Sequence, residues 1–204
     1  MIQTLTTVDL SDNEIGNIGA QHLAETFRNH KVLTILELSY NQIGNDGAQY
    51  LNDAFEENKT LIKLNLEGNP GSYCTTMSAI AQIRNDKALS SIDLRWKQYG
   101  DDEIKLLTNE LYNNKTITEL KFQKSKISNT GIQYLADMLR NNTTVTSIDL
   151  SENQIGDIVA IYLTDALKNN KTLVLLSLQS HQIGNTGAQQ LAVALKNNKV
   201  ANFS

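Results

Sequence analysis

The residues best suited to acid–base or nucleophilic chemistry are three histidines and one cysteine. His22 falls on a predicted helix, His30 in the loop after that helix, and His181 in a predicted turn near the other end of the chain. A catalytic cysteine needs an adjacent base such as a histidine imidazole. Cys74 and the three histidines stand at repeat positions that do not bring them together. We therefore expect surface and turn histidines, an inert thiol, no catalytic residue and no enzyme activity.

Short glycine-rich segments raise the separate question of phosphate binding. The sequences GNIG, GNDG and GNTG each precede a predicted helix, yet neither GxxxxGK[ST] nor a strand-linked GxGxxG occurs. Acidic stretches such as SDNEIGNIG lack the ligand spacing of an EF-hand. We interpret these segments as turns, and we predict neither a cofactor nor a metal site.

Composition narrows the class of protein further. The 204 residues carry a net charge of −4, whereas non-specific nucleic-acid binding needs a strongly basic field. A single cysteine excludes an internal disulfide and a multi-cysteine metal site, and it favours the cytosol. The apolar runs are too short to cross a bilayer, and the first residues lack the basic and apolar regions of a secretory signal peptide. We expect a cytoplasmic protein with no membrane segment.

An internal repeat with a period of 28 residues dominates the chain. The units begin at Leu5, Leu33, Leu61, Leu89, Ile117, Val145 and Leu173. They follow LxxLxLxxNxIGxxGAxxLAxALxxNKT without insertions or deletions, and repeat positions 4 and 6 are apolar in every unit. We predict a single domain of seven repeats over residues 5–200, with short tails at 1–4 and 201–204.

Each unit combines two hydrophobic periods. The LxL segment is typical of a strand, because successive side chains point to opposite faces. The second half has apolar residues at helical spacing, and the asparagines after it tolerate a left-handed helix end. Stacked strands would pair into one parallel sheet, and the wider helices would force the stack to curve. The predicted fold is an α/β solenoid, a curved arc with a concave parallel β-sheet and convex α-helices.

In these features the chain resembles the leucine-rich repeat family, specifically its ribonuclease-inhibitor-like class of 28-residue repeats, over residues 5–200. The resemblance implies a recognition module in which asparagines at repeat position 9 bond backbone groups of the turn. These structural turn asparagines are Asn13, Asn41, Asn69 and Asn153. Three units instead hold Lys97, Ser125 and His181 at that position. We expect those three turns to be less well braced, or to be braced by water.

The third unit departs most from the pattern. Its stretch GNPGSYCTTMSAIAQI has Gly71 in place of isoleucine and Ala79 in place of leucine, and it contains the only proline, Pro70. We expect a shortened or shifted helix at this point. Sequence drift is favoured over a functional bend as its cause.

The predicted concave face carries the candidate binding residues. Equivalent positions on neighbouring strands lie about 5 Å apart, so repeat positions 3, 5, 7 and 8 form ladders across the sheet. Arg95 and Trp96 interrupt columns of small and polar residues, and arginine, tryptophan and tyrosine are enriched at interface hot spots. The predicted partner-binding residues are Tyr40, Glu67, Arg95, Trp96, Gln123 and Lys124.

Two interpretations of this surface remain open. In the functional one, Gly68 leaves a slot between the rings of Tyr40 and Trp96 that receives a side chain of the partner. Acidic residues on one side and lysines on the other would orient that partner.

In the structural interpretation, the same residues only neutralise the charges of their neighbours. Arg95 would pair with Glu67, and Lys121 would relieve repulsion between carboxylates on neighbouring strands. Such exposed pairs contribute about 0–1 kcal/mol each. Tyr99 replaces an inward isoleucine and is assigned to the core.

The leading functional interpretation is non-catalytic binding of a partner protein on the concave face. A composition rich in Asn, Lys and Ile favours a bacterial effector acting in a host cytosol as the particular identity. An alternative is a self-associating scaffold, a homo-oligomer joined through uncapped repeat ends. A distant alternative is nucleic-acid or ribosome binding through Arg95, Lys97, Lys124 and Lys126, which the net charge disfavours.

Overall fold

The structure is a computed structural model that describes residues 4–97, 99–198 and 202–203. The chain divides into two compact units, Met1–Lys87 (unit 1) and Ala88–Ser204 (unit 2). Each unit repeats a strand followed by a helix, as the two hydrophobic periods predict. The extent of the domain, residues 5–200, remains a prediction.

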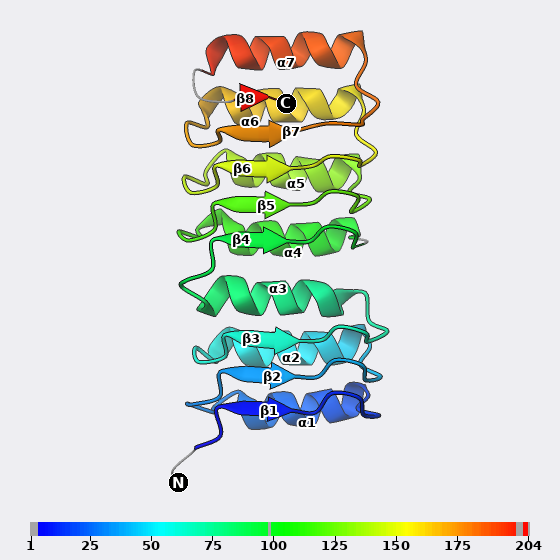
Figure 1. The fold of residues 1–204 in the computed structure, drawn as a ribbon, viewed down its shortest axis with the longest axis vertical. Coiled ribbons are helices and arrows are strands. Elements are labelled where there is room, and N and C mark those ends of the chain that lie inside the picture. The colour runs from blue at the N-terminus through cyan, green and yellow to red at the C-terminus, as the bar shows by residue number, and fades with distance from the viewer. Residues whose placement is uncertain (1–3, 98, 199–201, 204) are drawn as a thin grey trace. The chain divides into compact units, whose positions relative to one another are not determined.

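Unit 1 contains three strand–helix repeats, which Figure 1 shows in chain order. They are β1 (Thr7–Asp9), α1 (Asn17–Phe27), β2 (Ile35–Glu37), α2 (Asn45–Glu57), β3 (Lys63–Asn65) and α3 (Tyr73–Asn85). The strands pair in parallel in the order β1-β2-β3. Leu36 lies opposite Val8 on one side and Leu64 on the other, so identical repeat positions face each other.

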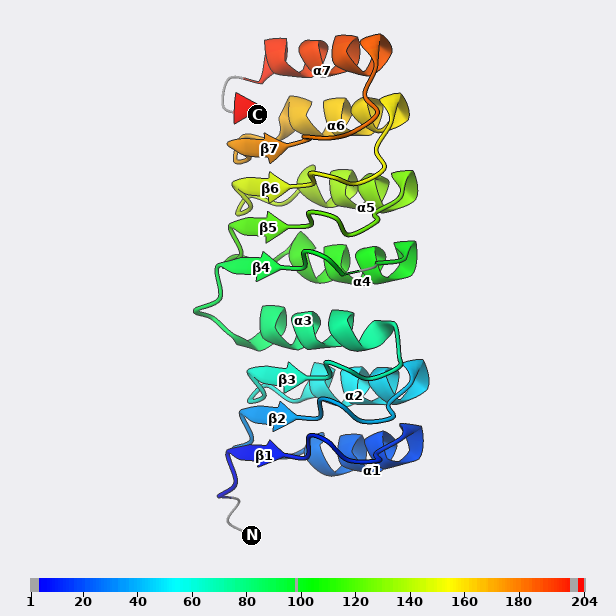
Figure 2. The ribbon, with the colours of Figure 1, turned by 45° about the vertical axis from the view of Figure 1, so that its right-hand side comes forward.

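Unit 2 continues the pattern and ends on an additional strand. It contains β4 (Ser91–Asp93), α4 (Asp101–Tyr112), β5 (Glu119–Lys121), α5 (Asn129–Leu139), β6 (Ser147–Asp149), α6 (Asp157–Asn169), β7 (Leu175–Ser177), α7 (Asn185–Asn197) and β8 (Asn202–Phe203). Within each unit the strands lie on one side and the helices on the other (Figures 1 and 2). Part of the predicted C-terminal tail therefore belongs to the sheet, because β8 pairs with β7.

The core of each unit lies between the strands and the helices. The predicted inward residues of repeat positions 4 and 6 are buried in the interior repeats, among them Leu36, Leu38, Leu120 and Phe122. Burying a side chain of this size stabilises the fold by about 1.5–3 kcal/mol. Tyr99 is only 5% exposed and packs edge-on against Phe122, so its assignment to the core is confirmed.

The prediction of one continuous parallel sheet is wrong. The described strands form a three-stranded and a five-stranded sheet, with β3 and β4 in different sheets. In repeats 1 and 2, the N–H at repeat position 6 bonds the next strand, as Leu38 N does with Asn65 O at 2.8 Å. In repeat 3 the equivalent Leu66 N–H instead donates to the Ser78 hydroxyl of α3 at 3.1 Å. This donor is therefore satisfied within unit 1.

The expectation of a shortened or shifted helix in the third repeat is also wrong. Helices α2 and α3 both have 13 residues, and each begins at the same repeat position. The substitutions act on the turn before the helix. A Cβ atom at Gly71 would lie 2.6 Å from the carbonyl carbon of Gly44, so the turn approaches the preceding repeat more closely than isoleucine would allow.

Asparagine side chains at repeat position 9 connect neighbouring turns. The Asn41 amide donates to Leu10 O at 2.9 Å and to Leu38 O at 3.1 Å, while its Oδ1 accepts the Ile15 N–H at 3.0 Å. Asn69 and Asn153 make the same kinds of bond in later repeats. The turns thereby satisfy backbone groups that the strand ladder leaves unpaired.

Two turns without this asparagine are nevertheless braced by side chains. The Ser125 hydroxyl donates to Leu94 O at 2.8 Å, and the ring nitrogens of His181 lie 2.8 Å from Leu150 O and 2.6 Å from Asn153 O. These two turns are thus braced by protein side chains, through fewer hydrogen bonds than the Asn41 side chain makes. Each places a hydrogen-bonding group at the carbonyl oxygen that an asparagine amide would reach.

Candidate partner-binding surface

A left-handed backbone at repeat position 8 projects one residue per repeat at the end of each strand. These residues, with positive φ angles between 52° and 72°, are Asp12, Tyr40, Gly68, Trp96, Lys124, Glu152 and Ser180. The Trp96 N–H donates to Gln123 O at 3.0 Å, and the same bond recurs in other repeats, which fixes the conformation. A side chain in this region costs about 1 kcal/mol relative to glycine. Stability of the backbone therefore gives no reason for tryptophan or tyrosine here.

In unit 2 this column forms a connected group, the strand-face cluster of Trp96, Gln123, Lys124 and Glu152. The Trp96 side chain is 64% exposed, and Lys124 Nζ lies 4.3 Å from its ring centroid. The same ammonium is 2.8 Å from Glu152 Oε2, and Gln123 Nε2 donates to Glu152 Oε1 at 2.7 Å. Hydrogen bonds from Lys124 and then Gln123 lower the pKa of Glu152.

Arg95 makes its ion pair within its own repeat. Its Nε donates to Asp93 Oδ1 at 2.9 Å, and its second donor, Nη2, reaches Asp93 Oδ2 at 2.6 Å. This bidentate contact is the main reason why the pKa of Asp93 is lowered. In the structural interpretation the charge of Arg95 is neutralised by a neighbouring acid. Asp93 is such an acid.

The neighbouring strand carries a second ion pair. Lys121 Nζ lies 2.9 Å from Glu119 Oε2, which also accepts a hydrogen bond from the Ser91 hydroxyl at 2.8 Å. The bond from Lys121 is the largest cause of the lowered pKa of Glu119, followed by the bond from Ser91. Lys121 also contributes a smaller lowering of the pKa of Asp93. The predicted relief of carboxylate repulsion therefore operates alongside a direct pair.

The strand face of unit 1 has a different arrangement. Tyr40 is 58% exposed, and its ring lies against Gly68, where an added Cβ would come within 2.5 Å of Tyr40 Cδ1. The Tyr40 ring thus fills the space that the missing side chain leaves, and the predicted empty slot at Gly68 is wrong. Glu37 is paired with Lys63 at 2.6 Å, and Glu67 is exposed.

The six predicted partner-binding residues divide between the units. Tyr40 and Glu67 lie in unit 1, whereas Arg95, Trp96, Gln123 and Lys124 lie in unit 2. Sequence reasoning missed Glu152, which anchors both Gln123 and Lys124. Its position in the same column, one repeat after Lys124, was the signal that could have identified it.

The residues with catalytic side chains have structural surroundings. His30 Nδ1 accepts the Leu33 N–H at 3.0 Å, and His22 lies 3.8 Å from Glu25 on the surface of α1. Cys74 is buried, and burial raises its pKa to about 11. Within the part of the chain that the structure describes, no group of three His, Cys, Asp or Glu side chains is arranged to hold a metal.

Comparison with known proteins identifies the family. The sequence model described as Leucine Rich repeat matches residues 2–24, 29–51, 113–136, 141–158 and 169–192, which together make up more than half of the chain. The chain therefore belongs to the leucine-rich repeat family. The matched segments leave out residues 52–112, where the third and fourth repeats depart from the pattern. Among curated proteins no relative matches the sequence.

Solved structures share the fold at low sequence identity. A structure of the leiomodin-1 actin-binding site 2 is 20% identical with a TM-score of 0.58, and the match covers 66% of this chain and 80% of that one. The tropomodulin C-terminal domain of Caenorhabditis elegans is 15% identical with a TM-score of 0.57, over 63% and 82%. Internalin C2 of Listeria monocytogenes is 18% identical with a TM-score of 0.48, over 98% and 80%. The first two likenesses support the α/β repeat fold.

Helix length bears on membrane insertion. Among the described residues, no helix combines the length and the apolar character that spanning a bilayer requires.

Proposed function

We propose that this protein is a non-catalytic recognition module that binds a partner protein on the strand face of unit 2. The observation that carries the proposal is the exposed Trp96 ring with Lys124 stacked on it. Tryptophan is a frequent interface hot spot because burying its large ring releases much apolar surface from water. Of the other predicted residues, Lys124 lies on the ring, Gln123 bonds Glu152 of the same cluster, and Arg95 precedes Trp96 in the chain.

The charges of this surface fit a folded protein better than a nucleic acid. Arg95 and Lys124 are each held by a carboxylate, at 2.6 Å from Asp93 and 2.8 Å from Glu152. A phosphate backbone would have to displace both carboxylates, whereas a protein surface can supply opposite charges to each member of a pair. Nucleic-acid or ribosome binding therefore stays a distant alternative.

The finer identity of the module is proposed from the repeat period and the composition. Its placement in the ribonuclease-inhibitor-like class rests on the 28-residue period. The cytosol is the proposed compartment, and a bacterial effector in a host cytosol is the particular role that the composition favours. One structural neighbour is named as an actin-binding site. Because that likeness is one of fold, actin enters only as one candidate ligand in the test.

The test uses Trp96 as its own reporter, since it is the only tryptophan. Partners captured from lysate by the wild-type protein are purified, and each is titrated while Trp96 emission is followed, with purified actin as a separate arm. We expect a blue shift on binding, because the ring loses contact with water.

Variants separate this surface from the rest of the molecule. Trp96→Ala should lose the captured partner, whereas Tyr112→Ala, which removes an exposed aromatic ring at the end of α4, should retain it. Circular dichroism establishes that both variants are folded. Equal capture by the wild-type protein and by Trp96→Ala would overturn the proposal.

A further inference from the structure

The first repeat exposes a face that is covered in the interior repeats. This head face consists of Ile15, Gly19, His22, Leu23 and Thr26, which line a hollow of about 270 Å³. Thr26 is exposed, although the residues at the same repeat position in later helices, Ala54, Ala166 and Ala194, are buried. The preceding helix covers this face in each of those repeats, and α1 has no preceding helix among the described residues.

The last described helix exposes the complementary face. This tail face consists of Asn185, Ala188, Ala192 and Lys196 on α7, all of them exposed. Ala160 of α6, at the same repeat position as Ala188, is buried. Two alanines on the surface of α7 thus occupy positions that the repeat otherwise uses for packing against the next helix.

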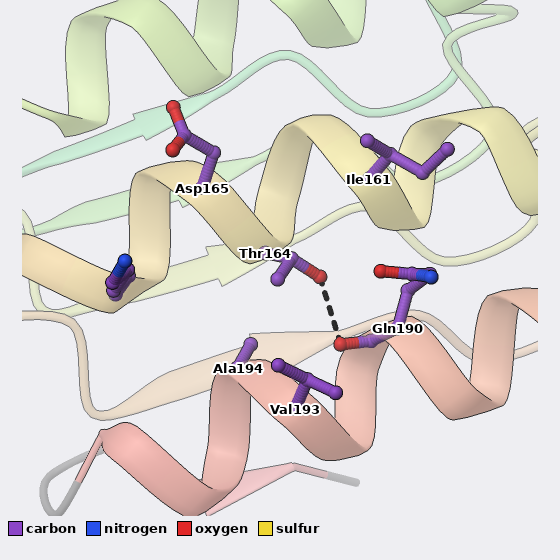
Figure 3. Close-up of a pocket in the computed structure, with 7 residues that line it drawn as sticks. Ile161, Thr164, Asp165, Gln190, Val193 and Ala194 are labelled. Carbon is purple, nitrogen blue, oxygen red and sulfur yellow. Dashed lines mark hydrogen bonds between the residues drawn. The ribbon is translucent and has the colours of Figure 1, made fainter.

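The contact between α6 and α7 shows how a tail face receives a head face. Figure 3 shows Thr164 of α6 beside α7, where its hydroxyl donates to Gln190 O at 2.9 Å. Ala194 lines the same groove. In repeat numbering, Ala192 corresponds to Thr164, whereas His22 and Thr26 correspond to Gln190 and Ala194. The two exposed faces therefore occupy the repeat positions that form the two sides of an interior junction.

Polar groups on the two faces also correspond. Between the first and second repeats, Asn17 Oδ1 accepts the Gly44 N–H at 2.7 Å and the Gly47 N–H at 3.1 Å. These two bonds cap the start of α2. Asn185 stands at the repeat position of Asn17. Gly16 and Gly19 stand at those of Gly44 and Gly47.

The charges correspond as well. In the contact of α5 with α6, Arg140 lies 2.8 Å from Asp165. Lys196 of the tail face stands at the repeat position of Arg140, and Glu25, beside the head face, stands at that of Asp165. Apolar packing, helix capping and charge are thus complementary between the two ends.

We propose that the chain self-associates head to tail, with the tail face of one copy packed on the head face of a second copy. Such a contact joins two different surfaces, so each pair of copies keeps a free head and a free tail, and further copies add to them until the assembly closes on itself or stays open. It uses none of the strand-face cluster, and its failure would leave the proposed recognition function untouched.

Strand β8 sets a condition on this contact. It pairs with β7 at Leu175 and Leu176, where β1 of a second copy would pair. The proposed contact therefore replaces the two-residue β8 by the three-residue β1 of the second copy. A chain that ends at Asn198 should associate more tightly than the full chain, because it has no strand to displace. If it does not, the placement of β1 against β7 is wrong.

Complementary blocked variants test the proposal. Thr26→Arg blocks the head and Ala192→Arg blocks the tail, and both residues are exposed, so the fold should tolerate the changes. Sedimentation velocity of the full chain should show species above 22.7 kDa that grow with concentration. Each variant alone should remain monomeric. An equimolar mixture should form dimers and nothing larger, because only one pair of good faces is present.

A control variant carries the same new charge outside the head and tail faces. Asn109→Arg adds the same charge at an exposed site on α4 and should associate like the wild-type chain. A full chain that stays monomeric at every concentration overturns the proposal. Association of either single variant at the wild-type level overturns it too, and failure of the mixture to dimerise excludes head-to-tail geometry.

A charge reversal tests the register of the contact. Lys196→Glu and Glu25→Lys should each weaken association by up to about fivefold, the range expected for an exposed ion pair. The double variant should regain the wild-type association constant. If the double variant is weaker than both single variants, the two residues do not face each other.

Discussion

The ammonium of Lys124 lies 4.3 Å above the ring of Trp96 while it remains 2.8 Å from the carboxylate of Glu152. One cation therefore links an exposed aromatic ring to an acid on the following repeat. A cation over a tryptophan face is held by the ring quadrupole, and the carboxylate restricts where that cation can sit. The arrangement orders a side chain that would otherwise be mobile on the surface.

Acid should dismantle this link in a defined way. The pKa of Glu152 is lowered below its ordinary value of 4.5, first by Lys124. The interaction is therefore complete above that ordinary value and is lost as the pH falls through the lowered one. Trp96 emission should change with a midpoint below pH 4.5, before far-UV circular dichroism reports unfolding. The Glu152→Gln variant should lack this transition, and its persistence there would assign it to another group.

The left-handed backbone at Trp96 predicts an inverted order of glycine and alanine. At φ 63°, glycine avoids the clash that a Cβ atom causes, so Trp96→Gly should be more stable than Trp96→Ala by about 1 kcal/mol. At Gln49, inside α2, the order should reverse, and glycine should be less stable than alanine by about 1 kcal/mol. Urea unfolding of the four variants measures both differences. The same order at both sites would contradict this backbone assignment.

The asparagine at position 9 should matter most where it is buried. Asn153 donates to Phe122 O and Leu150 O and accepts N–H groups from Ser125 and Ile127. Its replacement by alanine leaves these groups unpaired and should cost on the order of 3 kcal/mol. Asn13 is exposed, and its amide bonds only turn carbonyls of its own repeat, so Asn13→Ala should cost less than about 1 kcal/mol. Chemical denaturation that finds equal losses would refute a role that depends on burial.

Most of the fold could be predicted from the repeat. The strand–helix unit recurs at a fixed period, so the positions of the strand and the helix in one repeat give their positions in the others. Leu36, Leu120 and the other inward residues follow from period alone, and so does the order of strand and helix in each repeat. The division into two sheets did not follow from this pattern. The Leu66 N–H donates to Ser78, a short side chain on α3, and a pattern of hydrophobic positions carries no information about such a bond.

The sequence predicted which residues share a column of the candidate surface, but it did not predict which side chains contact each other. The sequence places Trp96 and Lys124 next to each other in one ladder, and the left-handed backbone of that column brings the ammonium over the ring. Which acid each cation selects depends on rotamers, and Arg95 pairs with Asp93 of its own repeat. The Tyr40 ring fills the space at Gly68. This could not be predicted, because the sequence does not fix the direction in which that ring turns.

Two buried hydroxyl groups should reduce stability. Thr76 Oγ1 and the Tyr99 hydroxyl have no hydrogen-bond partner among the described residues, and burial raises the pKa of Tyr99. Removing an unsatisfied polar atom without changing the shape of the side chain should stabilise each site by about 1 kcal/mol. Thr76→Val and Tyr99→Phe make these changes, and thermal unfolding measures them. A lower midpoint for either variant would show that its hydroxyl is satisfied, for example by a bound water.

Cys74 and Trp96 give each unit its own reporter of unfolding. Cys74 is the only cysteine and lies buried in unit 1, whereas Trp96 is the only tryptophan and lies in unit 2. Burial raises the Cys74 pKa to about 11, so a thiol reagent at neutral pH should react only after unit 1 opens.

The two reporters should give different denaturation midpoints. Strands β3 and β4 belong to different sheets, and the Leu66 N–H that could join them is occupied by Ser78. Repeat arrays hold together through contacts between neighbours, and an interrupted ladder weakens the coupling at one junction. Thiol labelling and Trp96 emission, followed over the same urea series, should therefore report two transitions. The variant Ser78→Ala frees the Leu66 N–H and serves as the matched comparison. Coincident midpoints in the wild-type chain would mean that it unfolds as one cooperative unit despite the division of its sheet.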